Sequence, residues 1–189
     1  MTGMLIGATF GAIFVFINAS APLNAALGIL LRVAAALALA GVIAMWLQAI
    51  RQARATGVEP ALPGAAQGAT MFGRGFLLVA VIEAVALFGG IAVLGAWQQP
   101  EQVNVAWVAF VVGVHFVALA PVWKSRAIAV PGAVLTVLGI AGFVMAATAA
   151  LDWVPFVSGV LSGATLLAGS LVSARNGLAS QNEQASVTR

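Results

Sequence analysis

Six long apolar runs constrain the fold of this chain more than any other feature of its sequence. They cover Met4–Ser20, Leu23–Ile50, Gly75–Trp97, Val103–Val122, Ala127–Ala150 and Trp153–Ser173. About 20 apolar residues are enough for one helix to cross the hydrocarbon core of a bilayer. The runs are continuous and rich in Ala and Leu, and they lack the alternation of a membrane β-barrel. We therefore predict an all-α, polytopic integral membrane protein built as a bundle of six transmembrane helices.

The scarcity of charge supports the same conclusion. Of the 189 residues, 62% are hydrophobic and only 7% are charged, whereas about 25% of the residues in soluble domains are charged. So few charges could not cover a water-facing surface, so the expected partner of most of the surface is the lipid bilayer. The net charge of +3 is spread along the chain without a basic, aromatic-rich stripe, which argues against nucleic-acid binding.

The basic residues predict the orientation of the bundle. With six spans both termini lie on one side, and the connections and tail on that side contain Arg51, Arg54, Arg74, Lys124, Arg126, Arg175 and Arg189. The opposite connections contain no Lys or Arg and carry Glu101 and Asp152 instead. By the positive-inside rule we expect both termini to be cytoplasmic, in a multi-pass protein of the cell membrane. Interfacial tryptophans fit this frame, with Trp97, Trp107 and Trp153 expected near the outer ends.

The segments outside the apolar runs are short, with one exception. The connection 51–74 contains two prolines and several glycines, so we expect a cytoplasmic linker or a short surface helix, after a second helix that continues to about Ala55. No Lys or Arg precedes the first apolar run, so we expect a span there rather than a signal peptide. Residues 1–175 are predicted to form one transmembrane domain, followed by a polar cytoplasmic tail, 176–189.

Three ionisable residues are predicted to lie deep in the membrane: Arg32, Glu83 and His115. At a rise of about 1.5 Å per residue, Glu83 and His115 each lie about 13 Å from the cytoplasmic side, and Arg32 lies about 13 Å from the outer side. All three therefore fall near the midplane of a core about 30 Å thick. Because such residues are costly in hydrocarbon, we expect a shared substrate or proton site between the second, third and fourth helices.

Two interpretations of these residues remain open. Glu83 could pair with Arg32, while His115 exchanges a hydrogen bond or a proton with Glu83. Alternatively, the Arg–Glu pair stabilises the bundle and the histidine is an ordinary packed residue. A metal site is disfavoured, because one His and one Glu supply two ligands where zinc needs three or four. We expect no metal and no cofactor.

Small and hydroxyl residues form a second pattern. Ser158, Ser162, Thr165 and Gly169 recur on one face of the last helix, and Gly7–Gly11 and Gly159–Gly163 form GxxxG pairs. Small residues let membrane helices approach closely, so close packing within the chain is expected, and the same faces would suit a homo-oligomer. The alternative is that Ser158, Ser162 and Thr165 line a cavity.

The function predicted from these features is transport or conduction of a small solute or ion, optionally linked to protons, through the midplane polar site. The alternative is a non-transporting membrane module, such as an assembly partner, a sensor or an immunity-type protein, in which the Arg–Glu pair is structural. A membrane-embedded enzyme is a third hypothesis. It is weaker because the sequence has no nucleophile elbow, HExxH motif or phosphate-binding glycine loop, and we expect no catalytic residues.

Overall fold

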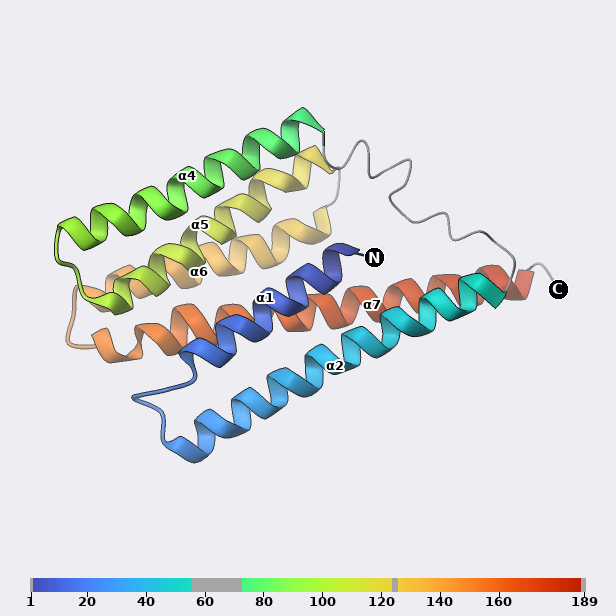
Figure 1. Cartoon of the computed structure of the whole chain (residues 1–189), viewed down its shortest axis with the longest axis horizontal. Coiled ribbons are helices and arrows are strands. Elements are labelled where there is room, and N and C mark those ends of the chain that lie inside the picture. The colour runs from blue at the N-terminus through green and yellow to red at the C-terminus, as the bar shows by residue number, and fades with distance from the viewer. Residues whose placement is uncertain (1, 56–72, 124–125, 188–189) are drawn as a thin grey trace.

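The computed structural model describes residues 2–55, 73–123 and 126–187, and all regular structure in these ranges is helical. The α-helices are α1 (Thr2–Asn18), α2 (Ala25–Ala55), α4 (Arg74–Ala96), α5 (Glu101–Val122), α6 (Ala129–Ala146) and α7 (Leu161–Val187) (Figure 1). Two short 3-10 helices, η1 (Arg126–Ile128) and η2 (Leu151–Trp153), and a π-helical segment, η3 (Pro155–Val160), complete the described elements. The prediction of an all-α chain is confirmed.

Five of these helical segments are long and apolar enough to cross a membrane, which indicates a membrane-embedded protein. They are α2, α4, α5, α6 and the continuous stretch from η2 into α7. The apolar helix α1 is shorter, with 17 residues and a length of about 26 Å.

The helix boundaries lie within a few residues of those predicted, with one clear difference. Helix α2 ends at Ala55, as expected. The last helix, however, continues to Val187, so most of the polar tail predicted from residue 176 extends the helix. Residues 56–72, which make up most of the predicted linker, lie outside the described residues.

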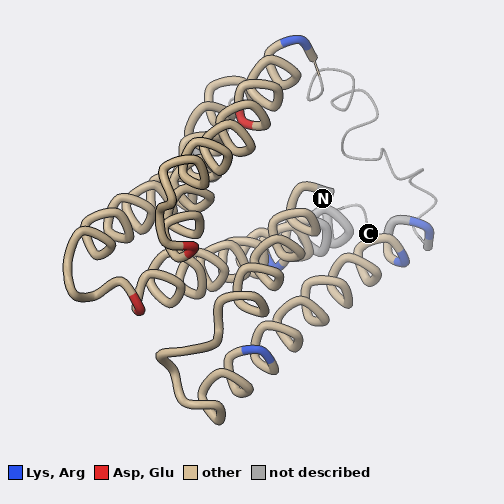
Figure 2. Tube along the Cα trace, turned by 60° about the vertical axis from the view of Figure 1, so that its left-hand side comes forward, with Lys and Arg blue, Asp and Glu red and all other residues tan. Residues whose placement is uncertain are grey.

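The helices form two groups of three (Figures 1 and 2). In one group α5 packs most extensively against α6, and α4 lies along α5. In the other group α1 packs against α7, and α2 contacts both of them. The π-helical segment η3 contacts α1, α5 and α6, so it joins the two groups. Figure 1 places the start of α1, the end of α2, the start of α4 and the end of α7 at the same end of the bundle.

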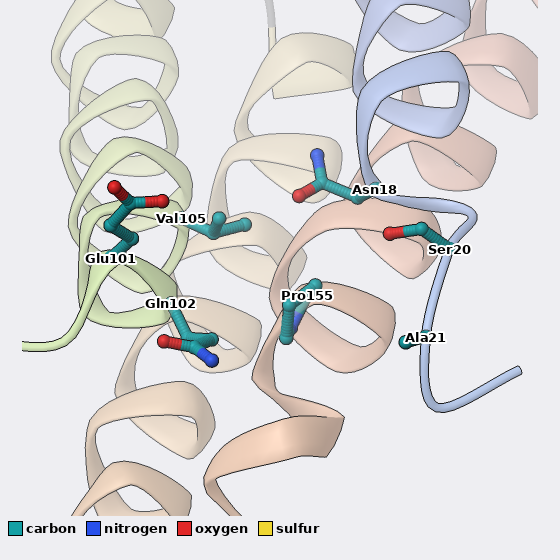
Figure 3. A pocket seen from close by; sticks show the side chains of 7 residues that line it. All are labelled: Asn18, Ser20, Ala21, Glu101, Gln102, Val105 and Pro155. Atoms are coloured by element: carbon teal, nitrogen blue, oxygen red, sulfur yellow. The ribbon is translucent and has the colours of Figure 1, made fainter.

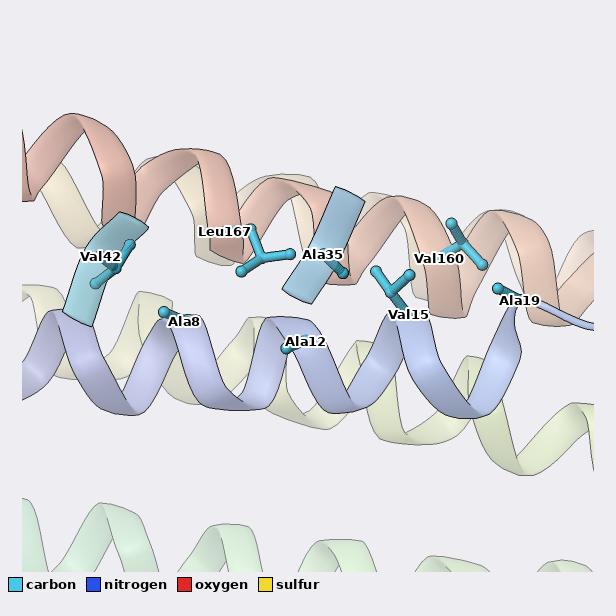
Figure 4. Packing of buried hydrophobic residues seen from close by; sticks show 8 residues of the cluster. All are labelled: Ala8, Ala12, Val15, Ala19, Ala35, Val42, Val160 and Leu167. Carbon is cyan, nitrogen blue, oxygen red and sulfur yellow. The ribbon is translucent and has the colours of Figure 1, made fainter. Parts of the chain in front are cut away.

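Small side chains dominate the buried core of the α1–α2–α7 group (Figure 4). Its buried residues are Ala8, Ala12, Val15, Ala19, Ala35, Val42, Val160 and Leu167. Because lipid is as apolar as these side chains, close van der Waals packing rather than hydrophobic burial must hold the helices together.

Glycines set the closest helix approaches. A Cβ atom at Gly11 would lie 2.7 Å from the carbonyl oxygen of Gly163, and one at Gly163 would lie 2.5 Å from the carbonyl oxygen of Gly11. In the other group, a Cβ atom at Gly139 of α6 would lie 2.6 Å from the backbone nitrogen of Phe110 in α5. The predicted packing role is therefore confirmed for Gly11 of α1 and Gly163 of α7.

Candidate functional site

An ionisable pair lies between α4 and α5. The Nδ1 atom of His115 is 2.9 Å from Oε2 of Glu83. Glu83 is near the middle of α4, and the antiparallel course of α5 brings His115 to the same level (Figure 1). The two residues therefore meet at one level of the α4–α5 pair, and their depth in the membrane stays a prediction.

The two side chains are in close contact, but the contact lacks the alignment of a hydrogen bond. The distance is within the range for proton transfer between a carboxylate and an imidazole, yet Nδ1 of His115 is buried without a well-aligned hydrogen bond. The side chains of His115 and Glu83 are 12% and 24% exposed, respectively. The pair is thus largely, but not completely, enclosed by its own helices.

Aromatic contacts flank the pair on both sides along the α4–α5 interface. Toward one end, the indole Nε1 of Trp107 donates a hydrogen bond of 3.1 Å to the carbonyl oxygen of Ala86. The same ring packs against Gly90, where a Cβ atom would overlap it. Toward the other end, Phe76 stacks on Trp123 with 6.0 Å between ring centroids. Trp107, predicted to lie near the outer end of its helix, attaches α4 to α5.

Replacing Trp107 with phenylalanine should weaken this attachment. The variant keeps an aromatic ring against Gly90 but loses the hydrogen bond to Ala86, and we expect a loss of about 1 kcal/mol in stability. Trp97→Phe is the matched control, because the Trp97 ring is 71% exposed. Thermal unfolding in detergent measures both variants, and equal melting temperatures would contradict the structural role assigned to the indole.

Arg32 is not brought to this pair. Its Nε donates a hydrogen bond of 3.1 Å to the carbonyl oxygen of Phe16, in the last turn of α1. The last carbonyls of a helix lack partners within the helix and carry partial negative charge, so they accept an arginine well. Helices α2 and α4 lie on opposite sides of the bundle in both views (Figures 1 and 2). The expected Arg32–Glu83 pairing is therefore replaced by an Arg32–helix-end contact.

The predicted hydroxyl face of the last helix is used for packing. Ser158 and Ser162 are fully buried, and Oγ of Ser158 donates a hydrogen bond of 2.8 Å to the carbonyl oxygen of Leu138 in α6. Oγ of Ser162 has no hydrogen-bond partner, and Thr165 bonds to the carbonyl of Leu161 in its own helix. These contacts favour the packing interpretation over a cavity lining.

A recess lies where the two helix groups meet, at the end of the bundle at which α1 ends and α5 begins (Figure 3). It has a volume of about 480 Å³ and is lined by Asn18, Ser20, Ala21, Glu101, Gln102, Val105 and Pro155. Sequence reasoning missed this site, because its residues come from three separated segments. The only available signal was the group of polar residues beside predicted helix ends.

No protein-family model, curated protein or solved structure matches the chain.

Proposed function

We propose that the chain is a membrane transport or conduction protein for a small solute or ion, linked to proton movement through Glu83 and His115. The observation that supports this most is their 2.9 Å contact near the middle of two apolar helices. Ionisable side chains inside membrane helices are costly and mark proton relays or substrate paths. A carboxylate and an adjacent imidazole can both bind a proton near neutral pH, so a proton can pass from one side chain to the other.

The Glu83–His115 pair lies at the interface between α4 and α5 alone, so motion of α4 can make and break the contact. Helix α4 packs on α5, and none of its residues is buried. A slide or rotation of α4 along α5 would therefore separate Glu83 from His115 without disturbing the glycine-based contact between α5 and α6. In the proposed mechanism, this motion exposes the carboxyl group for protonation and its reversal returns the group to the imidazole.

The proposed orientation places both termini in the cytoplasm and the connection between α4 and α5 outside. A reporter inserted after Gln98, in this connection, should therefore give the signal of the outer compartment, and a reporter at the C-terminus should give the cytoplasmic signal. The reason is the positive-inside distribution of Lys and Arg. A cytoplasmic signal after Gln98 would reverse the orientation.

A non-transporting membrane module is the second candidate, and a specific observation favours it. The Glu83–His115 contact, the Trp107–Ala86 hydrogen bond and the Phe76–Trp123 stack together form a row of contacts that hold α4 on α5. In this second candidate, the Glu83–His115 contact serves only to attach α4 to α5. In that case the bundle would present its faces to partner proteins.

Proton flux separates the two candidates. The purified chain, reconstituted into liposomes that contain a pH-sensitive dye, should dissipate an imposed pH gradient faster than empty liposomes do. Valinomycin and potassium prevent a membrane potential from limiting the flux. A rate equal to that of empty liposomes, together with a lower melting temperature for His115→Ala, would favour the non-transporting module.

A further inference from the structure

The recess between the two helix groups has the dimensions of a small-molecule site. Its volume of about 480 Å³ lies within the usual range of about 300–1,000 Å³ for ligand pockets. This space is much larger than a single inorganic ion requires. Val105 and Pro155 supply apolar walls, while Asn18, Ser20, Glu101 and Gln102 supply polar atoms.

Asn18 is the most firmly held polar side chain of the recess. It is 8% exposed, and its Nδ2 donates a hydrogen bond of 2.8 Å to the carbonyl oxygen of Phe14. The Asn18 side chain packs directly against Gly159 of η3, since a Cβ atom at Gly159 would lie 2.5 Å from Cβ of Asn18. With Nδ2 engaged, the amide oxygen accepts no hydrogen bond from the described residues and turns toward Val105 and Pro155 (Figure 3).

The charge of the recess is negative. Glu101 is the only ionisable side chain in its lining. The nearest described arginine along the chain, Arg32, is bonded to Phe16 and does not line the recess. A carboxylate and an amide oxygen that accepts no hydrogen bond from the described residues together suit a ligand with both positive charge and N–H groups.

We propose that this recess binds a small primary organic ammonium compound. The ammonium group lies between Glu101 and the amide oxygen of Asn18, and the hydrocarbon part lies against Val105 and Pro155. A primary ammonium offers three donors, whereas a quaternary ammonium offers none, so the site should discriminate between them. This inference stands apart from the proposed function, because binding in the recess requires neither transport nor the Glu83–His115 pair.

A purely structural role of Glu101 has to be distinguished from binding. Glu101 lies in the first turn of α5, where a carboxylate stabilises the helix dipole. Glu101→Gln would then lower stability whether or not a ligand binds. The matched control is Asp152→Asn, because Asp152 is also an exposed acidic residue in a first turn but does not line the recess.

Calorimetric titration of the purified full chain in detergent with n-butylammonium chloride tests the proposal. Sodium chloride at equal ionic strength, sodium butyrate and tetramethylammonium chloride are the control ligands. We expect saturable binding of butylammonium alone. Glu101→Gln should weaken it at least about tenfold, the ratio that removal of one favourable charge contact would give, while Asp152→Asn should change it less than about twofold. Val105→Trp, which fills the recess and keeps the charge, should abolish it.

Three results would overturn the proposal. They are the absence of saturable binding to the wild-type chain, equal binding of tetramethylammonium or sodium, and unchanged binding by the folded Glu101→Gln and Val105→Trp variants. Because the titration needs no flux, loss of proton flux in a Glu83 variant that still binds butylammonium would leave the recess assignment intact.

Discussion

Replacing Glu83 with glutamine should reduce proton flux through the reconstituted protein by at least about 100-fold, the lower range for loss of a positioned acid–base group. Glutamine has nearly the same size as glutamate and can still reach His115, but it cannot bind and release a proton. The 2.9 Å contact is then kept as a packing contact while its chemistry is removed. Dissipation of a pH gradient in proteoliposomes measures the effect.

Two further variants, one outside the Glu83–His115 pair and one within it, serve as controls for this prediction. Asp152→Asn removes a carboxylate from an exposed position and should leave the flux unchanged. His115→Gln should lower flux to a similar extent, and the double variant should be no slower than either single one, because residues that act as a unit are not additive. If folded Glu83→Gln protein keeps full flux, the carboxylate is not the proton carrier.

Replacing Gly139 with valine should destabilise the fold by about 3 kcal/mol, the upper range for overpacking a close contact. The added Cβ would lie 2.6 Å from the backbone nitrogen and 2.7 Å from Cα of Phe110. Backbone atoms cannot turn aside as the end of a flexible side chain can, so α5 and α6 would have to separate. Thermal unfolding of the purified variant in detergent measures the loss.

Gly169→Val is the matched control, because nothing lies within 4 Å of a Cβ atom at Gly169. Valine also has a higher helix propensity than glycine, so the control should be neutral or slightly stabilising. Equal melting temperatures for Gly139→Val and Gly169→Val would contradict the close contact between α5 and α6.

The fold was largely predictable because membrane helices are encoded by long local runs of apolar residues. Each of the six runs became helical, and the end of α2 at Ala55 was anticipated from its sequence. The helical course of the tail through Val187 was not. Its polar residues gave no apolar periodicity, and a helix that is already nucleated by α7 continues at little cost.

The candidate sites show where sequence reasoning stops. Rise per residue gives the depth of a side chain, and it placed Glu83 and His115 at one level, as found. Depth does not tell which helices are neighbours. Arg32 had a similar depth, but α7 rather than α4 packs beside α2, and the guanidinium reaches the end of α1. The recess around Asn18 could not be predicted from the sequence either, since it depends on how the two helix groups meet.

The contact between Arg32 and Phe16 has a consequence for the lipid around the molecule. Helix α1 has 17 residues, about 26 Å, whereas the apolar span within α2 has 28 residues, about 42 Å. A hydrocarbon core of about 30 Å cannot match both lengths. In the proposed six-span arrangement, the longer helix would accommodate the mismatch by tilting, and the bilayer would thin where it meets the shorter one. Headgroups drawn inward beside α1 would bring water toward Arg32, and this arrangement would stabilise its charge beside the carbonyl oxygen of Phe16.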